Sequence, residues 1–270
     1  MRLSLAAASL IGALLFLWPF LGFGPAGDAP ALTVALATAV GLAGIELGTR
    51  RLDARGFALL VALSALAAGL RLVLVTGIGG FSPFFFLILC AGYALGPSFG
   101  FLTGAVALVV SAIATGGVGP WLPYQLFAAG WVGLGAGLVG RRRTGFPSRR
   151  DIAALAAYGV VAGFAFGLVM DLWDWSFFRG APDLGWQPGL SLSETVGRFV
   201  SFYLVTSLAY DAFRAVGNAA MVVALGAPML GALARLRSRW QLEIVPASAE
   251  PVAAGSAPPS GAPPSPAAAH

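Results

Sequence analysis

The sequence predicts an all-α protein, folded as a polytopic bundle of membrane helices. Hydrophobic residues make up 58% of the 270-residue chain and charged residues only 10%, which is too few to solvate the surface of a water-soluble domain of this length. Long apolar runs recur along the chain, and the arginines fall almost entirely between them. A net charge of +5 distributed in this way follows the positive-inside rule, so we expect a lipid bilayer and no nucleic acid as partner.

Eight apolar runs are candidate membrane spans. A helix rises about 1.5 Å per residue and the hydrocarbon core is about 30 Å thick, so a span needs about 20 residues. Six runs approach or reach that length: 3–23, 31–48, 57–76, 122–140, 151–173 and 215–234. Two shorter runs, 82–96 and 100–115, are separated only by Gly-Pro-Ser-Phe-Gly, and we expect both to cross with their turn buried among neighbouring helices.

The chain divides into three parts. Residues 1–48 form a pair of N-terminal helices, 49–240 the membrane core, and 241–270 an Ala/Pro/Ser-rich tail that cannot bury a core and is expected to be disordered. The first run shares with signal peptides a preceding Arg2 and small residues near Ala26. Its apolar stretch exceeds the about 7–15 residues usual for such peptides, which favours a retained helix.

Three arginine clusters orient the spans. They are Arg50, Arg51 and Arg55, then Arg141, Arg142, Arg143, Arg149 and Arg150, and finally Arg235, Arg237 and Arg239. Eight spans with both termini cytoplasmic, in the plasma membrane, place all three clusters inside. A ninth crossing by 194–213 would export the last cluster, so this segment is expected to lie at the outer face, as a possible lid over the site. Asp211 and Arg214 are one helical turn apart and can pair there.

The residues that the chain lacks exclude several kinds of chemistry. It has no lysine, one cysteine (Cys90, inside an apolar run) and one histidine (His270, in the tail). A Schiff-base lysine, a nucleotide-binding Gly-x-x-x-x-Gly-Lys loop, catalytic triads and His/Cys zinc sites are therefore excluded. We predict no catalytic residues, no metal and no cofactor, and only carboxylates remain as catalytic candidates.

The carboxylates Asp171 and Asp174 are spaced as D-x-x-D at the end of a predicted helix. Three interpretations stay open. They mark the water boundary of the helix, which is the favoured interpretation. They hold Mg²⁺ and a diphosphate, as in an intramembrane prenyltransferase, although no second D-x-x-D occurs. Or they face a ligand pocket together with Trp173 and Trp175.

A ligand pocket at the outer ends of the helices is the second candidate site. Six aromatic residues offer flat apolar surface and three polar residues can orient a ligand: Phe81, Phe84, Trp121, Tyr124, Trp173, Trp175, with Arg71, Gln125 and Asp171. An interfacial aromatic belt produces the same composition. The charge of Arg71, late in a span, needs either a partner or water at the membrane surface, so ligand binding and snorkelling both remain open.

Small residues recur at four-residue spacing and predict close helix contacts within the bundle. These residues are Gly100 and Gly104, Gly133 and Gly137, and Gly159, Gly163 and Gly167. The third run carries a similar stripe of Ala58, Ala62 and Ala65.

Several segments between Arg55 and Arg239 form a combined pattern. They are Ala58-x-x-x-Ala62 with Arg71, Phe81-Ser82-Pro83, Ala91-Gly92-Tyr93-Ala94-Leu95-Gly96-Pro97, Gly100-Phe101-Leu102-Thr103-Gly104, Gly119-Pro120-Trp121-Leu122-Pro123-Tyr124-Gln125, and Asp211-Ala212-Phe213-Arg214-Ala215-Val216-Gly217-Asn218. In this pattern the chain resembles the substrate-binding (S) component of an energy-coupling factor (ECF) vitamin transporter. The resemblance covers about two thirds of the chain and leaves the first two helices as additions to a six-helix core.

The resemblance implies a function without enzymatic activity. Such S components bind a vitamin at the outer face and dock on a membrane coupling subunit (T component) driven by two cytoplasmic ATPase subunits. By analogy, Ala58, Ala62 and Ala65 are expected to meet the coupling subunit, and the outward loops to form the ligand pocket. The Gly-Pro-Trp-x-Pro-x-Gln turn favours a cobalamin-type ligand, with riboflavin or another small vitamin still open.

Overall fold

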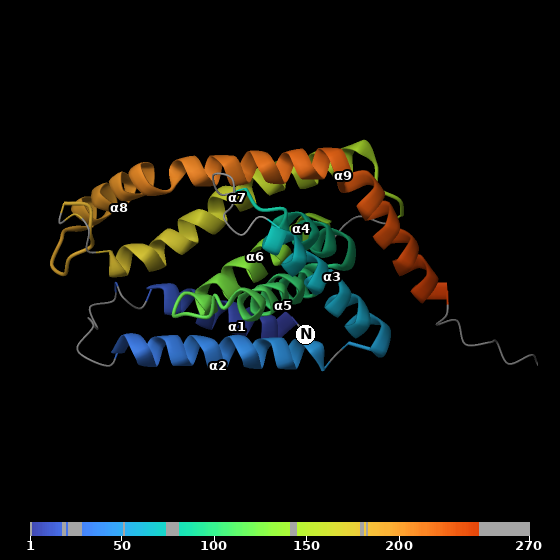
Figure 1. The fold of residues 1–270 in the computed structure, drawn as a ribbon, viewed down its shortest axis with the longest axis horizontal. Coiled ribbons are helices and arrows are strands. Elements are labelled where there is room, and N and C mark those ends of the chain that lie inside the picture. The colour runs from blue at the N-terminus through green and yellow to red at the C-terminus, as the bar shows by residue number, and fades with distance from the viewer. Residues whose placement is uncertain are drawn as a thin grey trace, which may run out of the picture.

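The protein is an all-helical bundle (Figure 1), as the sequence predicts. The structure, a computed structural model, describes residues 2–17, 20, 29–50, 52–73, 81–140, 145–178, 181 and 183–242. Within these residues the helices are α1 Arg2–Leu17, α2 Ala29–Thr49, α3 Ala54–Val73, α4 Phe84–Leu95, α5 Pro97–Thr115, α6 Leu122–Gly140, α7 Arg149–Phe177, α8 Leu192–Thr206 and α9 Leu208–Leu242. The predicted tail from residue 243 onward, Arg51 and Arg141–Arg143 lie outside the described residues.

Five helices are long and apolar enough to cross a membrane: α3, α5, α6, α7 and α9. The protein is therefore a multi-pass membrane protein. The most extensive contacts join α5 to α6 and α7 to α9, and α4 lies between α5, α6 and α9. The N-terminal helices α1 and α2 pack on each other and on this core, where α2 contacts α5 and α6. In Figure 1, α2 runs along one side of the bundle and α9 along the opposite side.

Helix α4 differs from the predicted span at 82–96. It has 12 residues, of which ten are buried. At about 1.5 Å per residue it measures about 18 Å, which is shorter than the hydrocarbon core. It ends at Gly96, whose φ of 100° suits glycine, and Pro97 begins α5 in the next position. Gly137 of α6 packs directly on this turn, which confirms that the turn lies among neighbouring helices.

The predicted glycine contacts are confirmed between α5 and α6. A Cβ atom placed on Gly104 would lie 2.6 Å from the carbonyl carbon of Ala129, and one on Gly100 would lie 2.6 Å from the carbonyl carbon of Gly133. These distances are shorter than any tolerated carbon contact, so only glycine allows the two backbones to approach this closely.

Helices α7 and α9 are held together by glycines on α7 and polar side chains on α9. Gly163 lies against the backbone of Ala215, and Gly167 lies against the carboxylate of Asp211. Asn218 Nδ2 donates to the carbonyl of Gly159 at 3.0 Å. The glycines expose backbone carbonyls to these donors, which satisfies polar groups that would otherwise be unpaired inside the bundle.

The segment predicted to lie at the outer face, 194–213, is divided between two helices. Helix α8 begins with a capping box, in which hydrogen bonds from Ser191 lower the pKa of Glu194. Helicity is interrupted at Ser207, and α9 then starts at Leu208, earlier than the predicted 215, and continues to Leu242. Asp211 therefore belongs to α9. Helix α9 contains Pro228 and bends toward its C-terminal end (Figure 1), because proline removes a backbone hydrogen bond.

Candidate functional site

A partly open cavity lies where six elements meet at one end of the bundle. Its volume is about 220 Å³. The lining residues come from the end of α3, the start of α4, the second half of α5, the start of α6, the second half of α7 and the start of α9: Arg71, Ser82, Phe84, Phe85, Leu108, Gln125, Phe166 and Arg214. We call it the Arg71 cavity. Three of the nine residues predicted from sequence, Arg71, Phe84 and Gln125, meet here.

Arg71 reaches the cavity from the last turn of α3. Its Nη1 donates a hydrogen bond to Ser111 Oγ of α5 at 2.9 Å, and its guanidinium carbon lies 5.8 Å from the centroid of the Phe84 ring. A cation over an aromatic face is stabilised by the electron-rich ring. The side chain is therefore directed inward, toward α4 and α5.

The second arginine of the cavity, Arg214, has its charge neutralised within the protein. It forms an ion pair with Asp211, whose side chain is only 1% exposed, and donates to the carbonyl of Gly163 at 3.2 Å. Asp211 also accepts a hydrogen bond from the Tyr203 hydroxyl at 3.1 Å. The predicted pairing of Asp211 with Arg214 is confirmed, and it lies inside the bundle between α7 and α9, since Gly167 covers the carboxylate.

Aromatic rings supply the apolar part of the cavity lining. Phe85 and Phe166 pack edge to face with centroids 4.8 Å apart, and Phe84 packs edge to face on Phe85 at 5.2 Å. The Arg214 guanidinium lies 5.1 Å from the Phe166 centroid. Each arginine of the cavity is thus backed by a phenylalanine, which leaves its hydrogen-bonding edges directed away from the ring.

The other predicted pocket residues do not line this cavity. Phe81 packs over Gly217 of α9, and Trp121, which is 39% exposed, covers Gly119 in the turn before α6. Tyr124 is buried beside Phe16 of α1, with ring centroids 5.0 Å apart, and beside Trp173 at 5.8 Å.

These rings belong to an aromatic cluster between the N-terminal helices and α7. Trp175 is buried, stacks on Phe20 and donates through Nε1 to the carbonyl of Leu184 at 2.6 Å. The expectation of a single aromatic pocket fails because neighbouring positions on α6 and α7 point to different sides of each helix. The packing of the N-terminal segment on this region was not predicted: Phe16 of α1 contacts Tyr124, and Phe20, beyond the end of α1, contacts Trp175.

The D-x-x-D carboxylates lie apart from the cavity, near the interruption between α8 and α9. Asp171 is buried, and its Oδ1 accepts from Ser207 Oγ at 2.7 Å while Oδ2 has no hydrogen-bond partner. Asp174, one turn further along α7, is exposed. Among the described residues, no three carboxylate, histidine or cysteine side chains are grouped so that they could hold a metal ion.

Five further residues around the Arg71 cavity were not predicted as site residues. Ser82, Phe85, Leu108 and Phe166 line the cavity, and Ser111 contacts its arginine. Ser82 and Phe85 flank predicted residues in the chain, so proximity could have suggested them. Ser111 and Phe166 carry no signal in the sequence, because a serine or phenylalanine in an apolar helix is ordinary. Arg214 was expected to pair with Asp211 but was not assigned to the site.

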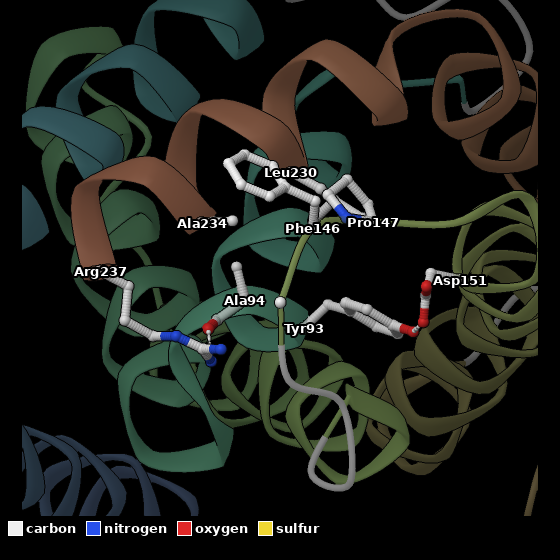
Figure 2. Close-up of a pocket in the computed structure, with 9 residues that line it drawn as sticks. Tyr93, Ala94, Phe146, Pro147, Asp151, Leu230, Ala234 and Arg237 are labelled. Carbon is white, nitrogen blue, oxygen red and sulfur yellow. Dashed lines mark hydrogen bonds between the residues drawn. The ribbon is translucent and has the colours of Figure 1, made fainter. Parts of the chain in front are cut away.

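The opposite end of the bundle holds a smaller hollow of about 40 Å³ between α4, α7 and α9 (Figure 2). The Tyr93 hydroxyl donates to Asp151 Oδ1 at 2.6 Å, and Arg237 Nη1 donates to the carbonyl of Ala94 at 3.0 Å. These bonds attach the end of α4 to the start of α7 and the end of α9. The hollow has room for only a few water molecules, and the residues around it join three elements of the bundle.

The alanines predicted to meet a coupling subunit lie on an open face. Ala58, Ala62 and Ala65 of α3 are all exposed, and the same face carries exposed Val61 and Leu66. Helix α3 contacts α4 and α5 through its other side. The stripe is therefore available to lipid or to another membrane protein.

Comparisons of the chain with protein-family models, with curated proteins and with solved structures found no match. The function is therefore argued from the geometry of the site.

Proposed function

We propose that this protein is the substrate-specificity (S) component of an ECF-type vitamin importer, and that the Arg71 cavity is its ligand site. The observation that carries the proposal is the cavity itself, a partly open space lined by Arg71, Gln125 and Arg214 in a largely apolar helix bundle. Charged and polar side chains inside a membrane protein are costly and are retained where a solute binds or passes.

The distribution of arginines supports an outward-facing cavity. Arg55 begins α3 and Arg149 begins α7, whereas Arg71 and Phe166 line the cavity further along the same helices. Arg237 likewise lies at the opposite end of α9 from the cavity. By the positive-inside rule the arginine-rich end is cytoplasmic, together with both termini, in the plasma membrane. The cavity then opens toward the outer face, where an importer captures its solute.

The exposed alanine stripe supports docking on a coupling subunit. Small side chains at Ala58, Ala62 and Ala65 let a partner helix approach closely, and their exposure leaves this face of α3 free. The chain has no lysine and therefore no phosphate-binding Gly-x-x-x-x-Gly-Lys loop. In the proposed transporter, two cytoplasmic ATPase subunits supply the ATP hydrolysis through the membrane coupling subunit.

The volume of the cavity limits the size of the ligand. Pockets for drug-sized molecules occupy about 300–1,000 Å³. A corrinoid is larger than such molecules, and the Arg71 cavity measures about 220 Å³. We therefore favour one of the smaller vitamins over the cobalamin-type ligand that the Gly-Pro-Trp-x-Pro-x-Gln turn favours.

The alternative of a prenyltransferase using Asp171 and Asp174 with Mg²⁺ has no observation in its favour. Asp171 is engaged by Ser207 and lies apart from the cavity. We keep this alternative only as an outcome of the test.

Coexpression with candidate coupling and ATPase subunits tests the proposal. We expect the protein to copurify with them and to support ATP-dependent uptake of one vitamin. Gln125→Leu, in the cavity, should abolish uptake and leave copurification unchanged. Turnover of a prenyl diphosphate that requires Mg²⁺ and is lost in Asp171→Asn would instead establish the alternative, and failure of both copurification and uptake would reject the transporter.

A further inference from the structure

We propose that the Arg71 cavity selects a small vitamin bearing one carboxylate, and that the Arg71 guanidinium binds this carboxylate. This inference rests on the proposed function and names the class of its ligand. It follows from three properties of the cavity: its charge, the free hydrogen-bond donors of Arg71, and the size and polarity of the remaining lining.

The cavity holds one positive charge that no protein carboxylate neutralises. Arg71 and Arg214 are the two charged residues of its lining. Arg214 is matched by Asp211 in an ion pair, and buried Asp171, which also interacts electrostatically with this pair, does not line the cavity. Arg71 contacts Ser111 and the Phe84 ring, both neutral, and within the described parts of the chain no carboxylate forms an ion pair with it.

Arg71 also keeps most of its hydrogen-bonding capacity. A guanidinium has five N–H donors in a fixed planar arrangement, and the hydrogen bond to Ser111 uses one of them. The planar fork matches the two oxygens of a carboxylate, which it binds through two parallel hydrogen bonds. In a membrane bundle such a bond is strong, because little water competes for the donors.

The other residues that line the cavity indicate which groups the rest of the ligand carries. Phe84, Phe85 and Phe166 offer ring faces and edges, while Ser82 and Gln125 are neutral hydrogen-bonding groups. A volume of about 220 Å³ admits a compact molecule. One unmatched cation balances a monocarboxylate, whereas a phosphate dianion would bring excess negative charge. A cationic vitamin such as thiamine would leave two like charges together.

Matched ligand pairs, in which a neutral group replaces the carboxylate, test the assignment. We would titrate the full-length protein in nanodiscs with biotin and biotinamide, nicotinate and nicotinamide, and pantothenate and pantothenol, and with riboflavin and thiamine. Isothermal titration calorimetry should detect one carboxylate that binds at least about tenfold more tightly than its neutral counterpart, since the neutral ligand leaves Arg71 unpaired. Arg71→Gln should remove this preference, and the matched control Arg55→Gln, at an exposed arginine of the same helix, should keep it.

Comparing the affinities of the two ligands of a pair needs only the wild-type protein. This comparison therefore tests the proposal even if Arg71→Gln does not fold. Equal or tighter binding of the neutral member overturns the proposal, as does binding of riboflavin or thiamine in place of any carboxylate. Binding of acetate as tightly as the carboxylate vitamin also overturns it, because the rings then contribute nothing. If no panel member binds, the carboxylate assignment is rejected, and copurification with the coupling subunit then decides separately whether the transporter proposal stands.

Discussion

At the residue scale, the two arginines of the cavity differ in how their charges are paired. Asp211 and Arg214 satisfy one another inside the bundle, whereas the direct partners of Arg71 among the described residues, Ser111 and Phe84, are both neutral. Keeping an unpaired cation in a membrane protein lowers its stability unless water or a ligand compensates. The contrast between these two arginines distinguishes a structural ion pair from a candidate binding group.

Removing the charge of Asp211 should destabilise the protein strongly. Asp211→Asn leaves Arg214 buried without a counter-ion, and breaking a buried pair in this way costs about 3–5 kcal/mol. The matched control is Glu46→Gln, which breaks the exposed pair of Glu46 with Arg50 and should cost about 0–1 kcal/mol. Unfolding in mixed detergent measures both values. Equal costs for the two variants would contradict the assigned pairing.

At the element scale, glycine stripes set the distances between helices. Gly104→Ala would force α5 away from the backbone of Ala129 on α6. We expect a destabilisation of about 1–3 kcal/mol, the usual cost of overpacking, and a lower thermal unfolding temperature in detergent.

The control for this prediction is Gly69→Ala in α3, where an added Cβ meets nothing within 4 Å. It should leave stability unchanged or raise it, because alanine favours the helix by about 1 kcal/mol. A Gly104→Ala protein as stable as the wild type would show that α5 and α6 lie further apart than described.

The open face of α3 should matter for assembly and not for folding. Ala62→Leu enlarges an exposed side chain in the alanine stripe, so we expect loss of copurification with the coupling subunit at an unchanged unfolding temperature. Ala157→Leu, at an exposed alanine of α7, is the matched control and should assemble normally. Normal assembly of Ala62→Leu would move the interface to another face.

Most of the helices could be predicted from the periodicity and composition of the sequence. Features that depend on neighbours in three dimensions could not be predicted in this way. The glycine repeats predicted close helix contacts, though not which helices would pair, because four-residue spacing alone places the glycines on one face. The length of α4 and the interruption at Ser207 arise from packing, which hydropathy does not report.

The candidate site was predicted in part for the same reason. Arg71 and Gln125 stand out as polar residues in apolar helices, whereas Phe166 is indistinguishable from any core phenylalanine. Tyr124 and Trp173 were grouped with the pocket on composition, but they pack in the cluster that also contains Phe16 of α1, a helix outside the family resemblance.

At the scale of the whole molecule, the cavity and the arginine-rich end of an importer must lie on opposite sides of the membrane. The native Cys90 is buried, so it gives a low background for thiol labelling. Val118→Cys, in the exposed turn before α6, should react with a membrane-impermeant maleimide on intact cells. Ser238→Cys, exposed near the end of α9, should react only after permeabilisation. The reverse pattern would place the cavity on the cytoplasmic side and contradict an importer.

The central claim is that the Arg71 cavity captures a solute, and native mass spectrometry of the protein with the vitamin panel tests it most directly. We predict one small molecule bound per protein chain, retained by the Ala157→Leu protein and lost from Gln125→Leu protein that unfolds at the same temperature as the wild type. No adduct with any vitamin, or an equal adduct on wild-type and Gln125→Leu protein, would contradict the claim.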